Sequence, residues 1–232
     1  MKRFPDKRIF ILFCLNAALY VLIVILDMMK VVSFVTQAQA MICDVLKYSG
    51  IISCLLVCVF SYSRTRERAP RIQTLVFCIT LGADFFLLFT PLFTTGVFIF
   101  LAAHLCALIR YKPRWALTAG ICSAAVFVFV MYFAQNILQA NADTSLFAAA
   151  SAAYAVLIIS VTISTFHAIQ PRINTLFSRI GMCLFLACDV NVMIFNVFPA
   201  GMAPHTASIV LMWFFYLPAQ TLLALSATRL TR

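Results

Sequence analysis

The chain has 232 residues, of which 64% are hydrophobic and only 10% are charged, and its mean hydropathy is +1.04. A soluble domain of this length does not bury so much apolar surface, so the composition excludes a water-soluble globular protein and indicates an integral membrane protein. The net charge of +10 reflects 17 Lys and Arg against 7 Asp and Glu. We find no nucleic-acid-binding motif, and we attribute the positive excess to orientation in the membrane and to anionic lipid headgroups.

Eight apolar stretches follow one another along the chain with short connections. A transmembrane helix needs about 20 apolar residues to cross about 30 Å of hydrocarbon, and the stretches run approximately over Ile9–Met29, Val45–Ser63, Ile72–Thr90, Thr95–Ile109, Trp115–Gln135, Leu146–Ile169, Ile173–Val197 and Ala207–Ala227. Almost no length remains for a soluble domain. We therefore predict an all-α fold in which residues 1–232 form a single integral membrane domain of about eight transmembrane helices.

The Lys and Arg positions predict how this bundle is oriented. With the N-terminus inside, fifteen of the 17 basic residues fall in cytoplasmic segments, and only Lys30 and Lys47 fall outside. Because cytoplasmic loops carry the positive excess, and a missed or extra helix would scramble the pattern, we expect both termini in the cytoplasm. The short loops slightly favour the plasma membrane of a bacterium over an internal membrane of a eukaryote. The oligomeric state stays open.

Four charged residues lie near the outer ends of the first two stretches, at Asp27, Lys30, Asp44 and Lys47. Ion pairs or contact with a lipid headgroup are alternatives, but charges at the end of a membrane span are more often a solvated rim, and that is our expectation.

Other sequence features indicate packing rather than chemistry. The nine cysteines lie mostly inside the apolar stretches and lack the spacing of metal ligands, so we expect them to serve as small packing residues. The small-residue run over Phe147–Ala155 predicts a close contact between helices. Phosphate-binding Gly-rich loops, GxSxG elbows and HExxH pairs are absent from the sequence, which removes the commonest hydrolase and nucleotide chemistries.

Three ionisable residues lie deep inside separate apolar stretches, at Asp84, His104 and Asp189. Such a group costs roughly 2.5–3.5 kcal/mol on insertion scales, so it usually faces a polar cavity, a partner or a substrate path. With a rise of 1.5 Å per residue, each is expected roughly 12–14 Å below the outer end of its helix. We therefore predict that the three residues share one pocket.

The local sequences around these residues resemble those of the YhhN-like lysoplasmalogenase family. LGADFFLLF around Asp84 is similar to the family's Gly-Asp helix, and GVFIFLAAHL at Gly96–Leu105 is similar to its Gly-Phe-His helix. GMCLFLACD at Gly181–Asp189 resembles its Gly-Phe-Ser-Asp segment, and FYLPAQTLLALS at 215–226 resembles its closing Tyr and Gln helix. The order and spacing agree over roughly the last two thirds of the chain. The chain departs from the family pattern at Ala83, Ala107 and Cys188, and it lacks the usual Met of the sixth helix, although Tyr154 fits the pattern there.

The resemblance implies hydrolysis of the vinyl ether bond of a lysoplasmalogen, a single-chain lysophospholipid, to a fatty aldehyde and a glycerophospho-amine. Protonation of an enol ether carbon creates an oxocarbenium-like cation that water attacks, which calls for an acid and an anion. We expect Asp84 and Asp189 to divide these roles, with His104 setting their charge states or shuttling a proton. No metal or organic cofactor is expected.

Neighbouring polar residues are candidates for substrate binding. Asn191 follows Asp189 closely, and Tyr216 and Gln220 are one helical turn apart, so they share a helix face. Interhelical hydrogen bonding is an equally good account of Tyr216 and Gln220.

Two alternatives to the hydrolase remain at this point. Asp84, His104 and Asp189 would also fit an interhelical polar cluster that only holds the bundle together. A proton-coupled transporter or a lipid-binding bundle would place carboxylates and His at similar depth, although the sequence shows no inverted repeat.

Overall fold

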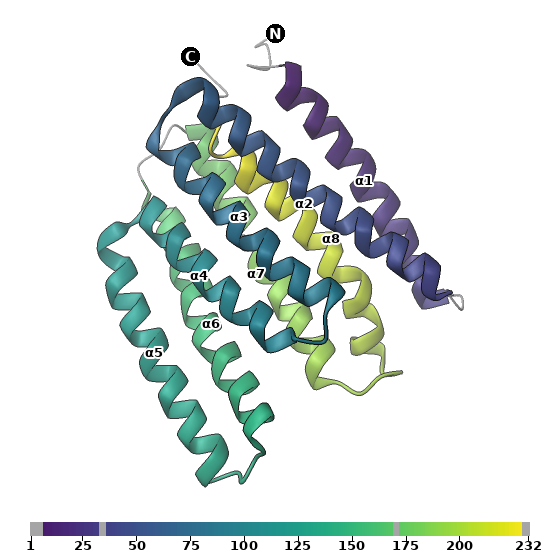
Figure 1. The fold of residues 1–232 in the computed structure, drawn as a ribbon, viewed down its shortest axis with the longest axis vertical. Helices are drawn as coiled ribbons and strands as arrows, with labels where there is room; N and C mark the ends of the chain where they lie inside the picture. The colour runs from purple at the N-terminus through teal and green to yellow at the C-terminus, as the bar shows by residue number, and fades with distance from the viewer. Residues whose placement is uncertain (1–6, 33–35, 169–171, 229–232) are drawn as a thin grey trace. The chain divides into compact units, whose positions relative to one another are not determined.

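The structure is a computed structural model, and it describes residues 7–32, 36–168 and 172–228 as eight α-helices without a strand (Figure 1). The helices are α1 (Lys7–Val32), α2 (Gln37–Thr65), α3 (Arg68–Phe89), α4 (Phe93–Tyr111), α5 (Pro113–Asn136), α6 (Ala142–Phe166), α7 (Arg172–Val197) and α8 (Ala203–Leu225). All eight are long and apolar enough to cross a membrane. This confirms the predicted all-α fold, and the protein is an integral, multi-pass membrane protein. Lys2, Arg3, Ile169, Arg229 and Arg232, which entered the predicted spans or the charge count, lie outside the described residues.

The chain divides into two compact units, which are described separately. Unit 1 comprises residues 1–71 and 169–232 and holds α1, α2, α7 and α8, together with the first residues of α3. Unit 2 comprises residues 72–168 and holds the rest of α3 with α4, α5 and α6.

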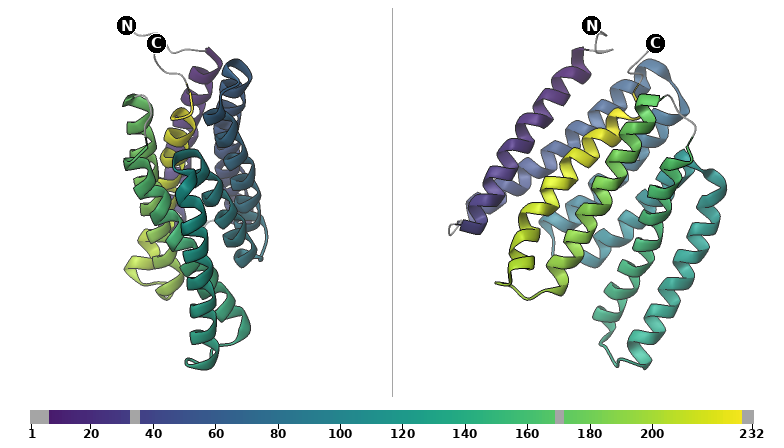
Figure 2. Two further views of the ribbon diagram at one scale, coloured as in Figure 1. Left: turned by 90° about the vertical axis from the view of Figure 1, so that its left-hand side faces the viewer. Right: turned by 180° about the vertical axis from the view of Figure 1, so that it is seen from behind.

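In unit 1, α8 packs against α1, α2 and α7. Helices α7 and α8 run antiparallel and side by side (Figures 1 and 2). Their ends are joined by Asn174, whose Nδ2 donates hydrogen bonds of 2.7 Å to the carbonyls of Ser226 and Thr228. These bonds satisfy two carbonyls at the end of α8 that have no partner inside the helix, so they fix the register of the two helices.

A network of hydrogen bonds between buried and partly buried side chains joins α1, α2 and α8. Asn16 Nδ2 donates to Cys54 Sγ at 3.0 Å and to Thr221 Oγ1 at 3.2 Å, while Ser53 Oγ donates to Asn16 Oδ1 at 2.6 Å. Buried polar groups need such partners, because a lost hydrogen bond leaves the full desolvation cost. Cys54 therefore does more than fill space, which corrects the expectation that the cysteines only pack.

In unit 2, α6 contacts both α4 and α5, which also contact each other. Helices α5 and α6 lie side by side as an antiparallel pair (Figure 2). Ala149, Ala150 and Ala153 on α6 are almost fully buried, and Ser123 Oγ on α5 donates to the Ala153 carbonyl at 2.9 Å. The close helix contact predicted from the small-residue run over 147–155 is therefore confirmed.

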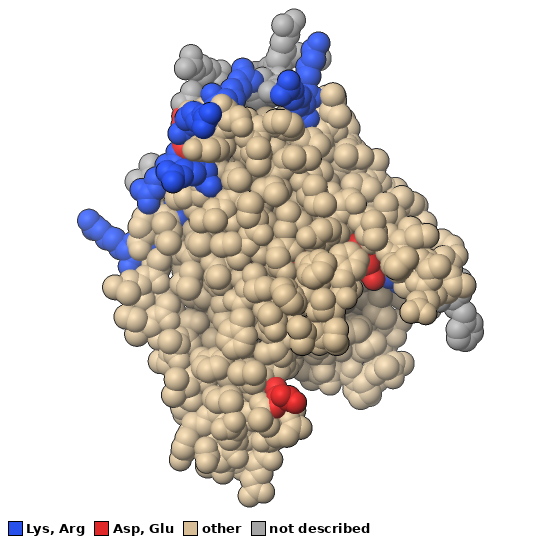
Figure 3. All heavy atoms as spheres, in the orientation of Figure 1, with Lys and Arg blue, Asp and Glu red and all other residues tan. Residues whose placement is uncertain are grey.

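Apart from Lys30 and Lys47, the basic residues of the described helices lie at or near the helix ends where α1 begins and α2 ends in unit 1, and where α4 ends and α5 begins in unit 2. In unit 1, the guanidinium of Arg8 lies 5.5 Å from the Phe60 ring, which brings the start of α1 to the end of α2. In unit 2, Arg110 at the end of α4 donates a hydrogen bond to Gln73 near the start of α3. On the face drawn in Figure 3 most of the surface is uncharged, and most of the visible Lys and Arg side chains gather in one region. This pattern fits the predicted orientation, which stays a prediction.

Helix α2 begins at Gln37, eight residues before the predicted start at Val45. Thr36 caps it, because its hydroxyl accepts from the Gln39 backbone N–H and the Gln39 side chain accepts from the Thr36 N–H. This capping box satisfies backbone donors that the first turn leaves open. The earlier start places Lys47 ten residues inside the helix rather than at its edge.

Candidate functional site

In unit 2, Asp84 on α3 and His104 on α4 are both buried, each with 4% of its surface exposed. The two helices are close neighbours, since a Cβ added to Gly96 of α4 would lie 2.6 Å from Leu87 Cδ2 and 3.2 Å from the Ala83 carbonyl of α3. Glycine is required at this position because it lets the two backbones approach. The structure therefore places two of the predicted residues on one pair of packed helices.

The levels of Asp84 and His104 differ more than the sequence predicted. Asp84 lies five residues before the end of α3 and His104 eleven residues after the start of α4, or about 8 Å and 16 Å from the connected helix ends at 1.5 Å per residue. Side chains tilt toward the N-terminus of their own helix. Because α3 and α4 are antiparallel, the two side chains lean toward each other along the axis and shorten this interval.

His104 is held by a backbone carbonyl and by aromatic rings. Its Nδ1 lies 2.9 Å from the Phe100 carbonyl oxygen, and its ring centroid lies 5.0 Å edge-on from that of Tyr154 on α6. A carbonyl only accepts, so Nδ1 donates this hydrogen bond, and Nε2 carries the lone pair when the imidazole is neutral. This arrangement fixes the ring and leaves Nε2 as the nitrogen that takes up a proton.

In unit 1, Asp189 is half-buried on α7, eight residues before the helix end. That is about 12 Å at 1.5 Å per residue, as predicted from the sequence. Asn191 is largely buried, and its Nδ2 donates to the Ala187 carbonyl one turn back at 2.8 Å. Its amide group is therefore already engaged by its own helix.

Tyr216 and Gln220 share a buried face of α8. The Tyr216 ring packs edge-on against Phe185 of α7 at 5.4 Å and against Trp213 at 5.0 Å. Gln220 is buried, and within the described part of the chain its Nε2 has no hydrogen-bond partner. A buried donor without a partner is costly, so this amide is the polar group of α8 most in need of a ligand or water. Substrate binding by Asn191, Tyr216 and Gln220 stays a prediction.

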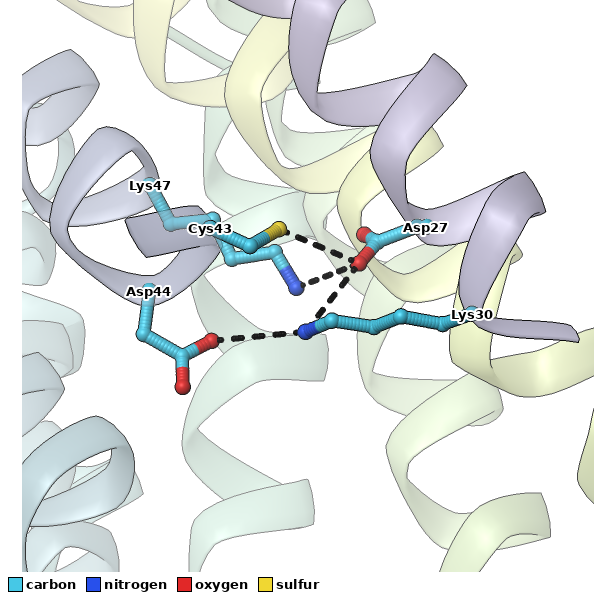
Figure 4. A network of polar contacts seen from close by, with 5 residues as sticks. All are labelled: Asp27, Lys30, Cys43, Asp44 and Lys47. Carbon is cyan, nitrogen blue, oxygen red and sulfur yellow. Dashed lines mark hydrogen bonds and ion pairs between the residues drawn. The ribbon is translucent and has the colours of Figure 1, made fainter. Parts of the chain in front are cut away.

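A network of charges in unit 1 links α1 to α2, and we call its five residues, Asp27, Lys30, Cys43, Asp44 and Lys47, the α1–α2 charge cluster (Figure 4). Lys47 Nζ donates to Asp27 Oδ1 at 2.9 Å, and Cys43 Sγ donates to the same oxygen at 3.5 Å. Lys30 Nζ lies 3.7 Å from Asp27 Oδ1 and 3.8 Å from Asp44 Oδ1. Four charges of alternating sign thus meet between two helices.

The expected solvated rim is wrong for the inner half of this cluster. The Asp27 side chain is fully buried and that of Lys47 is 6% exposed, whereas Lys30 and Asp44 are 20% and 27% exposed. The early start of α2 and the continuation of α1 to Val32 extend both helices beyond the predicted ends. Hydropathy assigns the residues between Met29 and Val45 to a connection. Thr36 and Gln39 nevertheless have the spacing of a capping box, which indicates the observed start of α2.

Trp213 connects the α1–α2 charge cluster to α8. Lys47 Nζ lies 4.9 Å from the centre of the Trp213 ring, a cation–π contact. The antiparallel packing of α7 and α8 shows which residues of α7 lie level with Trp213 of α8. Phe185 contacts Tyr216, and Gly181 lies against Ala219. One turn further along α7 from Phe185 is Asp189, level with the turn of α8 that carries Trp213. In unit 1, direct contacts join Asp27, Lys47 and Trp213, and the register places Asp189 near the level of Trp213.

Comparison with known proteins gives one match. Residues 51–227 match the YhhN family. The chain belongs to the YhhN family. No curated protein and no solved structure shows significant similarity to it.

The match to the YhhN family includes Asp84, His104 and Asp189 and begins inside α2. All of the α1–α2 charge cluster precedes residue 51, so it lies outside the part that matches the family. Ala83, Ala107 and Cys188, which depart from the family pattern, are all buried. They therefore alter packing around the candidate residues rather than the lipid-facing surface.

Metal binding finds no support among the described residues of this YhhN-family chain, where no group of three or more His, Cys, Asp or Glu side chains is arranged to hold an ion. The expectation that no cofactor is needed stays a prediction.

Proposed function

We propose that this YhhN-family protein is a hydrolase that cleaves the vinyl ether bond of a lysoplasmalogen within the membrane. The observation that carries the proposal is that the family match covers three ionisable residues of the membrane-spanning helices, Asp84, His104 and Asp189, of which two are buried. Membrane proteins seldom retain such groups without a function, because each is costly in hydrocarbon.

The proposed reaction begins with transfer of a proton from a carboxyl group to the outer carbon of the double bond. The carbon attached to oxygen then carries an oxocarbenium-like charge, which a carboxylate stabilises. Water adds to this carbon and loses a proton, and the resulting hemiacetal releases the glycerol oxygen to give the aldehyde. Asp84 and Asp189 are the two carboxyl groups that the scheme assigns to these steps.

His104 suits the role of a proton relay in this scheme. Its Nδ1–H is occupied by the Phe100 carbonyl, so proton uptake and release fall to Nε2. A general acid or base of this kind contributes typically about 10²–10⁴-fold to a rate. Over one cycle the carboxyl group gives one proton to carbon and the attacking water loses one proton. A relay that carries the proton from water back to the carboxylate therefore completes the turnover.

The substrate class fits the location of these residues. A lysoplasmalogen has a single chain and partitions into the bilayer, and exposed apolar side chains cover the helices of the protein, as on α5 at Leu117, Ile121 and Val128. Such a surface is expected where lipid replaces water as the solvent. The lipid tail therefore reaches the helices from the membrane.

The test is aldehyde release from a lysoplasmalogen by the purified protein in detergent. Release is expected with the vinyl ether lipid and not with the matching saturated ether. Asp84→Asn and Asp189→Asn should each lower it by about 10²–10⁴-fold, whereas Asp143→Asn, which changes an exposed carboxylate at the start of α6, should not. Substantial aldehyde release by both the Asp84→Asn and the Asp189→Asn variants would overturn the proposal. No release by the folded parent protein would also overturn it.

A further inference from the structure

The α1–α2 charge cluster has a buried floor and an open rim. Asp27 and Lys47 form the floor, with side chains that are 0% and 6% exposed, and Lys30 and Asp44 form the rim. The floor is tightly held, since Lys47 Nζ lies 2.9 Å from Asp27 Oδ1 and also packs on the Trp213 ring. A surface ion pair would show neither the burial nor the aromatic wall.

The rim is held loosely. Lys30 Nζ lies 3.7 Å and 3.8 Å from the carboxylate oxygens of Asp27 and Asp44. Both distances exceed the 2.7–3.2 Å of an ordinary N–H···O hydrogen bond. The ammonium of Lys30 therefore lies between two carboxylates with the charge attraction but without tight hydrogen bonds, and it is the more loosely held of the two ammonium groups.

The buried carboxylate has acceptor capacity to spare. Asp27 Oδ2 is buried, and within the described residues it has no hydrogen-bond partner, while Oδ1 takes all of the contacts that Figure 4 draws to Asp27. A buried carboxylate oxygen without a donor is costly. A ligand that supplies N–H donors next to Asp27 would recover part of that cost.

The charges of the cluster balance, with two carboxylates and two ammonium groups. We propose that the α1–α2 charge cluster binds a lipid headgroup carrying both a phosphate and a primary ammonium, with the ammonium taking the place of Lys30 between Asp27 and Asp44 and Lys30 turning to the phosphate. A zwitterion leaves the cluster neutral, whereas a lone anion or cation would leave a charge uncompensated near the membrane interior.

The same geometry discriminates between headgroup types. A primary ammonium donates three hydrogen bonds to the carboxylates, whereas a quaternary ammonium donates none and prefers the faces of aromatic rings. Lys47 already lies over the ring of Trp213. The cluster therefore selects a phosphoethanolamine-type headgroup over a phosphocholine-type one. As a statement about which lysoplasmalogen is cleaved, this inference rests on the proposed function.

The test measures binding rather than hydrolysis. The chain has two Trp residues, so Trp115→Phe leaves Trp213 as the only indole reporter, beside Lys47. Lysophosphatidylethanolamine and lysophosphatidylcholine with the same acyl chain are titrated into this protein in detergent, and the change in Trp213 fluorescence is followed. We expect about tenfold tighter binding of the ethanolamine lipid, the effect of one hydrogen bond to a charged group.

Two rim variants and one control complete the experiment. Asp44→Asn should bring the two affinities within about twofold of each other, and Lys30→Met should weaken both, because both lipids carry the phosphate. Asp143→Asn on α6 should change neither. Both rim side chains are partly exposed, so these variants should fold. Equal binding of the two lipids by the parent protein, or a preference that Asp44→Asn leaves unchanged, would overturn the inference. The ion pairs of the cluster would then serve only to hold α1 and α2 together.

Failure here is distinguishable from failure of the proposed function. The lysolipids carry an ester in place of the vinyl ether, so their binding reports on the headgroup alone. Selective binding without aldehyde release would leave the inference intact and overturn only the hydrolase proposal. Aldehyde release without headgroup selection would do the reverse.

Discussion

Unit 1 and unit 2 both bury ionisable side chains inside membrane-spanning helices, but they surround them differently. In unit 1, Asp27 meets the ammonium groups of Lys47 and Lys30 and the thiol of Cys43. In unit 2, the imidazole of His104 meets the Phe100 carbonyl and the edge of Tyr154. Charge is compensated by charge in the first case, whereas in the second a dipole and aromatic rings orient a group that can change its protonation state. The difference predicts that substitutions in the α1–α2 charge cluster mainly affect stability or binding, whereas those at Asp84 and His104 mainly affect turnover.

The largest expected effect follows substitution of the buried carboxyl group of unit 2. Asp84→Asn keeps the size of the side chain and removes its proton chemistry, so aldehyde release should fall by about 10²–10⁴-fold. The melting temperature in detergent should stay close to that of the parent protein. A large fall in melting temperature with activity retained per folded molecule would mean that Asp84 acts in stability rather than in turnover.

The next effect is on the stability of unit 1. Lys47→Met leaves Asp27 buried without its nearest ammonium, which should cost about 3–5 kcal/mol of unfolding free energy. Adding Asp27→Asn should recover much of this loss, because the uncompensated charge is gone. Denaturant titration of the two single variants and the double variant measures the coupling. Additive losses in the double variant would show that the two charges do not depend on each other.

Backbone packing in unit 2 gives a smaller effect with a matched control. Gly96→Ala should destabilise by about 1–3 kcal/mol, because the added methyl group would overlap Leu87 and press on the Ala83 carbonyl. Gly82→Ala, on the facing helix, should be nearly neutral, since its nearest neighbour is Ile99 Cγ2 at 3.8 Å. Melting temperatures of the two variants compare them directly, and equal values would contradict the close approach of α3 and α4.

The smallest effect on stability belongs to the rim of the α1–α2 charge cluster. Asp44→Asn removes a partly exposed charge whose contact with Lys30 is 3.8 Å long, so it should cost less than about 1 kcal/mol. Set beside Lys47→Met, this variant separates the rim of the cluster from its floor. A loss as large as that of Lys47→Met would mean that the rim also holds α1 to α2.

Much of the fold was predictable because membrane spans are defined by length and hydropathy. The stretch predicted for α7 differs from the helix by one residue, and those predicted for α3, α4 and α5 by a few. The start of α2 was missed, because Gln37, Gln39 and Asp44 interrupt the apolar residues over 37–44 and lower the mean hydropathy of the first two turns. The capping box at Thr36 carried the missing information.

Some of the candidate residues were also predictable from local hydropathy, and others were not. Asp84, His104 and Asp189 stood out from the sequence alone, because a lone ionisable group in an apolar stretch is conspicuous. Lys47 and Asp27 did not, since they were read as the polar ends of helices. Their burial depends on two helices extending past the predicted ends and packing together.

The amino-acid sequence by itself determined the class of the protein, its eight apolar helices and its YhhN-family motifs, since these depend on local composition and spacing. Only the tertiary structure decided that Lys47 meets Asp27 twenty residues earlier and Trp213 far along the chain, and that Gly96 brings α4 against α3. The physical reason is that burial, ion pairing and close backbone approach are properties of two helices together, and no single helix encodes which neighbour it meets.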